Sequence, residues 1–189
     1  FRIAAQLRVI DNDSSQVNQF FDEPTGYVGR INIEYRGASS SFFAKRNFGF
    51  ETQDRLGENR NLELLGLPAA NDWTLHGPYS DKSLMRNALI YQLGNAMGRY
   101  APRTRFCELF VNNDYRGVYL LVEKIKRDEN RVDIAKLTAA DTTGDELTGG
   151  YIIKVDRETE PGGGWFSNYD FNPFIAFHHP SADKLHPSQ

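Results

Sequence analysis

The chain has 189 residues, of which 40% are hydrophobic and 25% are charged, a composition typical of a globular domain. Its net charge of −3 gives no basic excess, which argues against a nucleic-acid-binding protein. The single cysteine excludes an intrachain disulfide and a four-cysteine zinc site. The sequence has no apolar run long enough to predict a membrane-spanning helix.

The first part of the chain is predicted to consist mainly of strands. Residues 1–11 and 27–36 alternate apolar and polar side chains, as half-buried strands do, with a polar loop between them. Residues 47–52 are predicted to form another strand after a turn of small residues. Residues 53–72 are predicted to be mostly loop, and residues 73–76 a short strand.

A long helix is predicted over residues 81–97. Apolar residues recur there at every fourth position, at Met85, Leu89, Leu93 and Met97. Ser80 is a suitable N-cap, and Gly98 lies where a glycine commonly ends a helix.

The remaining elements complete an α+β fold. Residues 105–111 and 115–122 predict a hairpin, in which Cys107 is expected to be a small core residue rather than a nucleophile. Residues 133–148 are predicted to be a short helix and loop, and residues 151–155 a last strand. The sequence therefore predicts a mostly antiparallel sheet with one long inserted helix.

A candidate phosphate-binding turn follows the strand over residues 27–36. Backbone N–H groups in a turn of small residues can approach an anion closely, and hydroxyls and cations add donors and charge. The residues of this kind are Arg36, Ser39, Ser40, Lys45 and Arg46. The turn does not have the Walker-loop spacing, and an ordinary hairpin turn flanked by surface cations is the alternative interpretation.

Two charged residues elsewhere are further candidates for nucleotide binding. Arg86 lies among apolar residues of the predicted helix, so it either binds a phosphate or forms a structural ion pair with a carboxylate. Glu123 ends the return strand of the hairpin, and in bilobal nucleotide-binding folds the strand before the interlobe connection passes the adenine. Its carboxylate is expected either to pair with Lys45 or to face solvent.

Several sequence blocks in register resemble the CotH (spore coat protein H) kinase family. In chain order they are IEYRGASS at residues 33–40 with Lys45 and Arg46, FGFE at 48–51, LGLP at 65–68, NDW at 71–73, GPYSDKSLMRN at 77–87, RGVYLLVEKI at 116–125 and GGYIIKVD at 149–156. One block alone is not specific, but their order and spacing together are, and they cover nearly the whole chain.

The resemblance implies an atypical, kinase-like bilobal fold with ATP and magnesium as cofactors. It implies phosphoryl transfer to serine or threonine of a spore-coat or secreted protein, outside the cytoplasm, at the cell surface or in the spore coat. Residues 1–156 would form the nucleotide-binding N-terminal lobe, and residues 157–189 a linker to a C-terminal lobe. The family's catalytic aspartates are expected beyond Gln189, so no catalytic or metal-binding residue is assigned and this stretch alone is expected to be inactive.

A non-catalytic role is the second hypothesis from the sequence. Aromatic residues make up 13% of the chain, and Trp73 and Trp165 could stack on sugar rings in an extracellular interaction or carbohydrate-binding module, or pseudokinase. Aromatic residues at strand spacing are more commonly part of a core. The sequence gives no indication of the oligomeric state.

Overall fold

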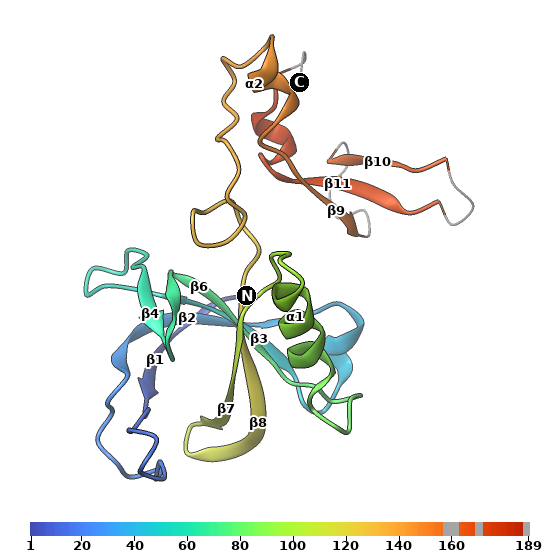
Figure 1. Cartoon of the computed structure of the whole chain (residues 1–189). Helices are drawn as coiled ribbons and strands as arrows, with labels where there is room; N and C mark the ends of the chain where they lie inside the picture. Colours follow the sequence, from blue (N-terminus) through green and yellow to red (C-terminus); the bar gives the residue numbers. More distant parts are fainter. Residues whose placement is uncertain (157–162, 169–171, 187–189) are drawn as a thin grey trace. The chain divides into compact units, whose positions relative to one another are not determined.

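The chain folds as two compact units, each with its own sheet (Figure 1). The computed structural model describes residues 1–156, 163–168 and 172–186. Unit 1 is Phe1–Lys124 and unit 2 is Ile125–Gln189. The division follows Lys124, whereas the sequence suggested a boundary after residue 156, so the strand predicted at 151–155 belongs to unit 2. The expected roles as a kinase lobe and a linker stay predictions.

Unit 1 is built on a six-stranded antiparallel sheet with the strand order β1-β2-β3-β6-β8-β7. The strands are β1 (Ile3–Val9), β2 (Tyr27–Arg36), β3 (Asn47–Thr52), β6 (Asp72–His76), β7 (Thr104–Val111) and β8 (Asp114–Glu123). In Figure 1 the sheet twists from β1 at one edge to the β7–β8 hairpin at the other. The prediction of a mostly antiparallel sheet is confirmed, whereas the likeness to a kinase lobe stays a prediction.

The core of unit 1 lies on the central strands. Trp73 of β6 is fully buried, and Tyr119 and Leu121 of β8 are almost as well covered. Two short strands, β4 (Leu62–Leu64) and β5 (Leu67–Ala70), form a separate two-stranded sheet whose leucines join this core. The sequence predicted this stretch to be mostly loop and missed the two strands, because strands of three and four residues are too short to show a periodic pattern.

The helix between β6 and β7 is α1 (Arg86–Ala96), which is shorter than the predicted 81–97. Leu84 has a φ of +61°, a left-handed conformation that an α-helix does not accommodate, so the helix begins only after it. Asp81 accepts the backbone N–H of Arg86 at 2.9 Å, and Ser80 makes no cap. Gly98 has a φ of +72° just beyond the end of α1, as the sequence predicted.

The apolar face of α1 is exposed within unit 1. The exposed fractions of Met85, Leu89, Leu93 and Met97 are 56%, 60%, 51% and 70%. The four-residue repeat therefore predicted the helix, but these side chains are not part of the core of unit 1.

Unit 2 contains a three-stranded antiparallel sheet with the order β10-β11-β9. Its elements are the helix α2 (Asp145–Thr148) and the strands β9 (Ile152–Asp156), β10 (Gly164–Phe166) and β11 (Phe174–His179), followed by the 3-10 turn η2 (Ala182–Lys184). Two of the strands lie in the stretch predicted to be a linker, of which residues 157–162, 169–171 and 187–189 lie outside the described residues. The described helices of both units are all too short or too polar to cross a membrane.

Candidate functional site

The turn after β2 is closed tightly onto the next strands. Gly37 has a φ of +103°, and a Cβ built there would lie 2.0 Å from Ser40 Oγ, so the turn needs glycine at this position. Ser40 Oγ accepts a hydrogen bond from Asn47 Nδ2 at 3.2 Å. Asn47 Oδ1 in turn accepts the backbone N–H of Gly77 at 2.7 Å. Asn47 therefore joins the turn after β2 to the end of β6.

At the same end of the sheet, the Lys45 side chain packs closely against Tyr119 and two glycines. Its Nζ is 4.9 Å from the ring centroid of Tyr119, in cation–π distance. A Cβ built on Gly77 would lie 3.0 Å from Lys45 Cγ, and one built on Gly117 would lie 3.3 Å from Lys45 Nζ. The two glycines thus leave the space that the lysine side chain occupies. Partial burial lowers the pKa of Lys45, because desolvation disfavours its charged form.

Arg36 and His76 extend this region across β2 and β6. Arg36 Nη1 donates to Thr74 Oγ1 at 2.5 Å. The pKa of His76 is lowered, first by burial and then by the charge of Arg36, with a smaller contribution from Lys45. The charge of Asp81 opposes this shift in pKa. Arg36, Lys45 and Asp81 therefore all lie close enough to His76 for their charges to act on it.

Among the residues that the structure describes, no carboxylate neutralises the two cations of this region. In the described part of the chain, neither Arg36 nor Lys45 forms an ion pair with aspartate or glutamate. We call Arg36, Ser40, Lys45 and His76 the β2–β3 site. An anionic ligand could therefore bind to Arg36 and Lys45 without first displacing a described carboxylate from either side chain.

The remaining turn residues of the prediction lie at the margin of the β2–β3 site. Arg46 turns its guanidinium over the ring of Tyr35, with Cζ 4.6 Å from the ring centroid. Its backbone oxygen accepts a hydrogen bond from Tyr119 Oη at 2.9 Å, which anchors the segment that carries Lys45. Ser39 is exposed in the 3-10 turn η1 (Ser39–Phe42).

Arg86 takes part in a structural ion pair. Its Nε lies 3.5 Å from Asp81 Oδ1, and its side chain is 79% exposed. The same carboxylate accepts hydrogen bonds from the backbone and hydroxyl of Ser83, and the hydroxyl bond is the main reason that the pKa of Asp81 is lowered. Of the two roles that the sequence left open for Arg86, the ion pair is the observed contact, and a role toward phosphate stays a prediction.

Glu123 neither pairs with Lys45 nor faces solvent, and both expectations were wrong. Its side chain is fully buried and accepts two hydrogen bonds from the Arg103 guanidinium, at 2.8 and 3.1 Å. A third comes from the backbone N–H of Arg103 at 2.9 Å. Glu123 lies opposite Trp73, whereas Leu120, three residues earlier on β8, lies opposite His76. The strand spacing therefore separates Glu123 from the β2–β3 site.

Several residues that shape the β2–β3 site were not identified from the sequence. They are Asn47, Gly77, Gly117 and Tyr119. Gly117 was the available signal, because a glycine inside a strand often marks a bulge or the close approach of another group. It has a φ of +85° and lies where the pairing of β7 with β8 shifts by one residue.

Metal and thiol chemistry receive little support from the described residues. Within residues 1–156, 163–168 and 172–186, no group of three or more His, Cys, Asp or Glu side chains is arranged to hold a metal ion. Burial raises the pKa of Cys107 to about 11, so its thiol stays protonated at neutral pH. The interpretation of Cys107 as a small, unreactive residue agrees with this environment.

Comparison with known proteins places the chain in a family. Inner spore coat protein H of Bacillus subtilis (strain 168) is 24% identical over 151 residues, which cover 74% of this chain. The matched region is 38% of the length of that relative, so the chain spans well under half of it. The family model described as CotH kinase protein matches residues 33–178, most of the chain and all of the β2–β3 site. The chain therefore belongs to the CotH kinase family.

Proposed function

We propose that the β2–β3 site binds the phosphates of ATP and that the protein uses ATP for phosphoryl transfer to serine or threonine of another protein. The observation that carries the proposal is the pair of cations, Arg36 and Lys45, held close to His76 without a carboxylate partner in the described residues. Membership of the CotH kinase family supports the choice of ATP as the ligand.

The burial of Lys45 favours an anionic partner. Its pKa is lowered because burial removes water from the ammonium, and no described carboxylate forms an ion pair with it. A phosphate oxygen beside Nζ would supply that charge and would restore the pKa of Lys45 toward its ordinary range. The planar guanidinium of Arg36 can hold two phosphate oxygens, while Lys45 acts as a point charge.

The residues of the β2–β3 site fit the phosphates better than they fit magnesium. ATP supplies the phosphoryl group, and this chain's residues would position and neutralise the phosphate oxygens. No cluster of metal-ligating side chains lies in the described residues, so no residue of this part of the chain is assigned to magnesium. Transfer to serine or threonine rests on family membership, as does a target among spore-coat or secreted proteins outside the cytoplasm.

A binding module without catalysis is the second candidate function. Trp165 and Phe166 of β10 are 44% and 52% exposed, which leaves aromatic surface that a sugar or a partner protein could cover. Trp73 is fully buried in the core of unit 1, so the expectation that it stacks on a sugar was wrong. This function predicts saturable binding of a glycan that Trp165→Ala abolishes, with no binding of ATP.

Calorimetric titration of ATP into the chain and its Lys45→Ala variant tests the proposal. Loss of a charge-assisted contact to phosphate should weaken binding by about tenfold or more. Arg8→Ala is the matched control, because Arg8 is an exposed cation on the edge strand β1 and should leave the affinity unchanged. A titration with adenosine separates the contribution of the phosphates from that of the nucleoside, since adenosine binding should not depend on Lys45.

If Lys45→Ala binds ATP more weakly but binds adenosine as the parent chain does, the result supports a phosphate site at Lys45. Equal affinities of the parent chain, Lys45→Ala and Arg36→Ala for ATP would rule out the β2–β3 site. Because Lys45 has no ion pair in the described residues, the variant is expected to remain folded, which thermal unfolding checks.

A further inference from the structure

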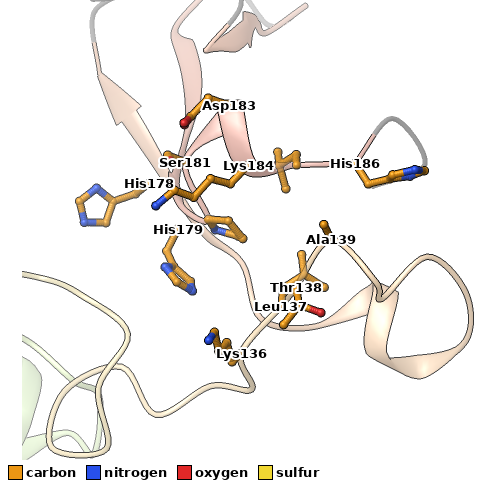
Figure 2. Close-up of a pocket in the computed structure, with 12 residues that line it drawn as sticks. Lys136, Leu137, Thr138, Ala139, His178, His179, Ser181, Asp183, Lys184 and His186 are labelled. Atoms are coloured by element: carbon orange, nitrogen blue, oxygen red, sulfur yellow. The ribbon is translucent and has the colours of Figure 1, made fainter.

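Unit 2 contains a cavity of about 860 Å³ that the proposed ATP site does not use. Three of its segments line this cavity: residues 136–139, the end of β11, and the turn that follows it to His186 (Figure 2). A volume of this size is in the range of small-molecule sites. The lining is rich in groups that carry or can accept a proton, namely Lys136, His178, His179, Lys184 and His186.

His179 faces a strongly cationic environment. Burial lowers its pKa, and the charges of Arg127, His178, Lys184 and Lys136 lower it further. Arg127, Lys136 and Lys184 are cations, so the potential at the imidazole is positive. One carboxylate, Asp183, also lines the cavity, but the hydroxyl of Ser181 already hydrogen-bonds to it and lowers its pKa.

The Nε2 atom of His179 is buried and has no hydrogen-bond partner among the described residues. In Figure 2 the imidazole projects from the end of β11 toward the segment that carries Lys136. His178 differs, because its Nε2 lies 2.8 Å from the carbonyl oxygen of Ile125 and must donate there. Buried polar atoms normally have a partner, so the open Nε2 indicates a group that can occupy the cavity.

We propose that this cavity binds a phosphate dianion, either free or as the monoester of an organic group. A phosphate dianion offers several acceptor oxygens, which suit the two lysines and the N–H of His179 arriving from three segments. A carboxylate carries only one charge and fewer acceptors. The cavity also has room for the organic part of an ester. A metal ion fits less well, since the described residues hold no metal-binding cluster and lysines surround the histidine.

The proposal is independent of ATP binding at the β2–β3 site, because the two sites share no residue and lie in different units. Two sources could supply the same phosphate chemistry: free inorganic phosphate, or a phosphorylated side chain such as phosphoserine.

Histidine NMR of the full chain, titrated with inorganic phosphate and with O-phosphoserine, tests this proposal. Binding should shift the ring signals of His179 and raise its pKa, because a dianion stabilises the imidazolium. Lys136→Ala should weaken this binding by about tenfold, as loss of a charged hydrogen bond does. Lys136 is exposed, so the variant should fold. Lys154→Ala is the matched control, since Lys154 lies on β9 outside the cavity.

A sulfate titration provides a charge that stays fixed while the pH is varied. Sulfate should bind more tightly as the pH falls through the pKa of His179, and His179→Gln should remove that dependence.

The relative affinities of the two phosphate probes identify the ligand. O-phosphoserine binding tenfold tighter than phosphate would identify a phosphorylated side chain, and equal affinities would identify the free ion. Unchanged His179 signals at millimolar concentrations of all three probes would overturn the proposal. So would an equal loss of affinity in Lys136→Ala and Lys154→Ala. The shift of the His179 signals on adding phosphate should persist in Lys45→Ala, which separates binding in this cavity from binding at the ATP site.

Discussion

Unit 1 contains two charged regions that differ in one respect, whether the charge is already paired inside the protein. At one end of β8, the buried carboxylate of Glu123 accepts hydrogen bonds from Nε and Nη2 of the Arg103 guanidinium and from the backbone N–H of Arg103. In the β2–β3 site, Arg36 and Lys45 lie near His76 and make no ion pair in the described residues.

This difference separates a structural charge from an available one. A buried carboxylate must be paired, because leaving it alone costs several kcal/mol, and its partners are then committed. A partly hydrated lysine can remain without an ion pair at small cost and can accept a ligand instead. On this argument Glu123 stabilises unit 1, while Arg36 and Lys45 are free to bind an external anion.

The largest effect should come from breaking the buried pair. Arg103→Ala removes the guanidinium from Glu123 and is expected to lower the free energy of unfolding by about 3 kcal/mol. Chemical denaturation measures the change. Arg116→Ala is the control, because its ion pair with Asp114 is on the surface and should contribute less than about 1 kcal/mol. If the two variants lost equal stability, Glu123 would not have the structural role assigned to it.

An intermediate effect is expected where the core meets the β2–β3 site. Tyr119→Phe removes the hydroxyl that donates to the backbone oxygen of Arg46 but keeps the ring below Lys45. The loss of this hydrogen bond should cost about 1 kcal/mol and should also weaken ATP binding, because the segment that carries Lys45 is less well held. Denaturation and calorimetry report the two effects.

Tyr35→Phe is the matched control for this variant, since Tyr35 is exposed and its ring, not its hydroxyl, contacts Arg46. Equal losses in both variants would contradict a specific role for the hydroxyl of Tyr119.

The smallest effect is a pH dependence from His76. Its pKa is lowered in the folded state, chiefly by burial, so the unfolded chain binds more protons just below pH 6.5. Stability from the neutral ring is therefore complete above the unfolded pKa and is lost as the pH falls through the folded pKa.

Because the His76 ring is only half-buried, the free energy of unfolding should fall by about half a kcal/mol or less as the pH is lowered. Unfolding curves between pH 5 and 7.5 should show this loss of stability in the parent chain and not in His76→Gln. A parent chain whose stability rose as the pH fell over that range would reverse the sign assigned here.

The exposed face of α1 shows a further limit of sequence patterns. The repeat of Met85, Leu89, Leu93 and Met97 predicts helical conformation, because these positions fall on one face. Whether that face is covered depends on which element packs against it, and in unit 1 these side chains stay more than half exposed. The start of α1 was missed for a local reason, the left-handed φ of Leu84, which no propensity scale predicts.

The sequence by itself determined the strands of the antiparallel sheet and the family. Alternation of apolar and polar residues is a local property, so β2 and β3 were predicted with their observed bounds. The turn with Arg36, Ser40 and Lys45 was found because small residues and cations lie close together along the chain.

Only the tertiary structure decided which charges are paired. Glu123 meets Arg103 across 20 residues of sequence, and His76 joins Arg36 from another strand. Strand register brings both pairs of residues together, and register depends on long-range strand pairing that the linear sequence pattern does not contain. The cationic cavity of unit 2 has the same origin, because Lys136 and His179 come from segments that only the fold brings together.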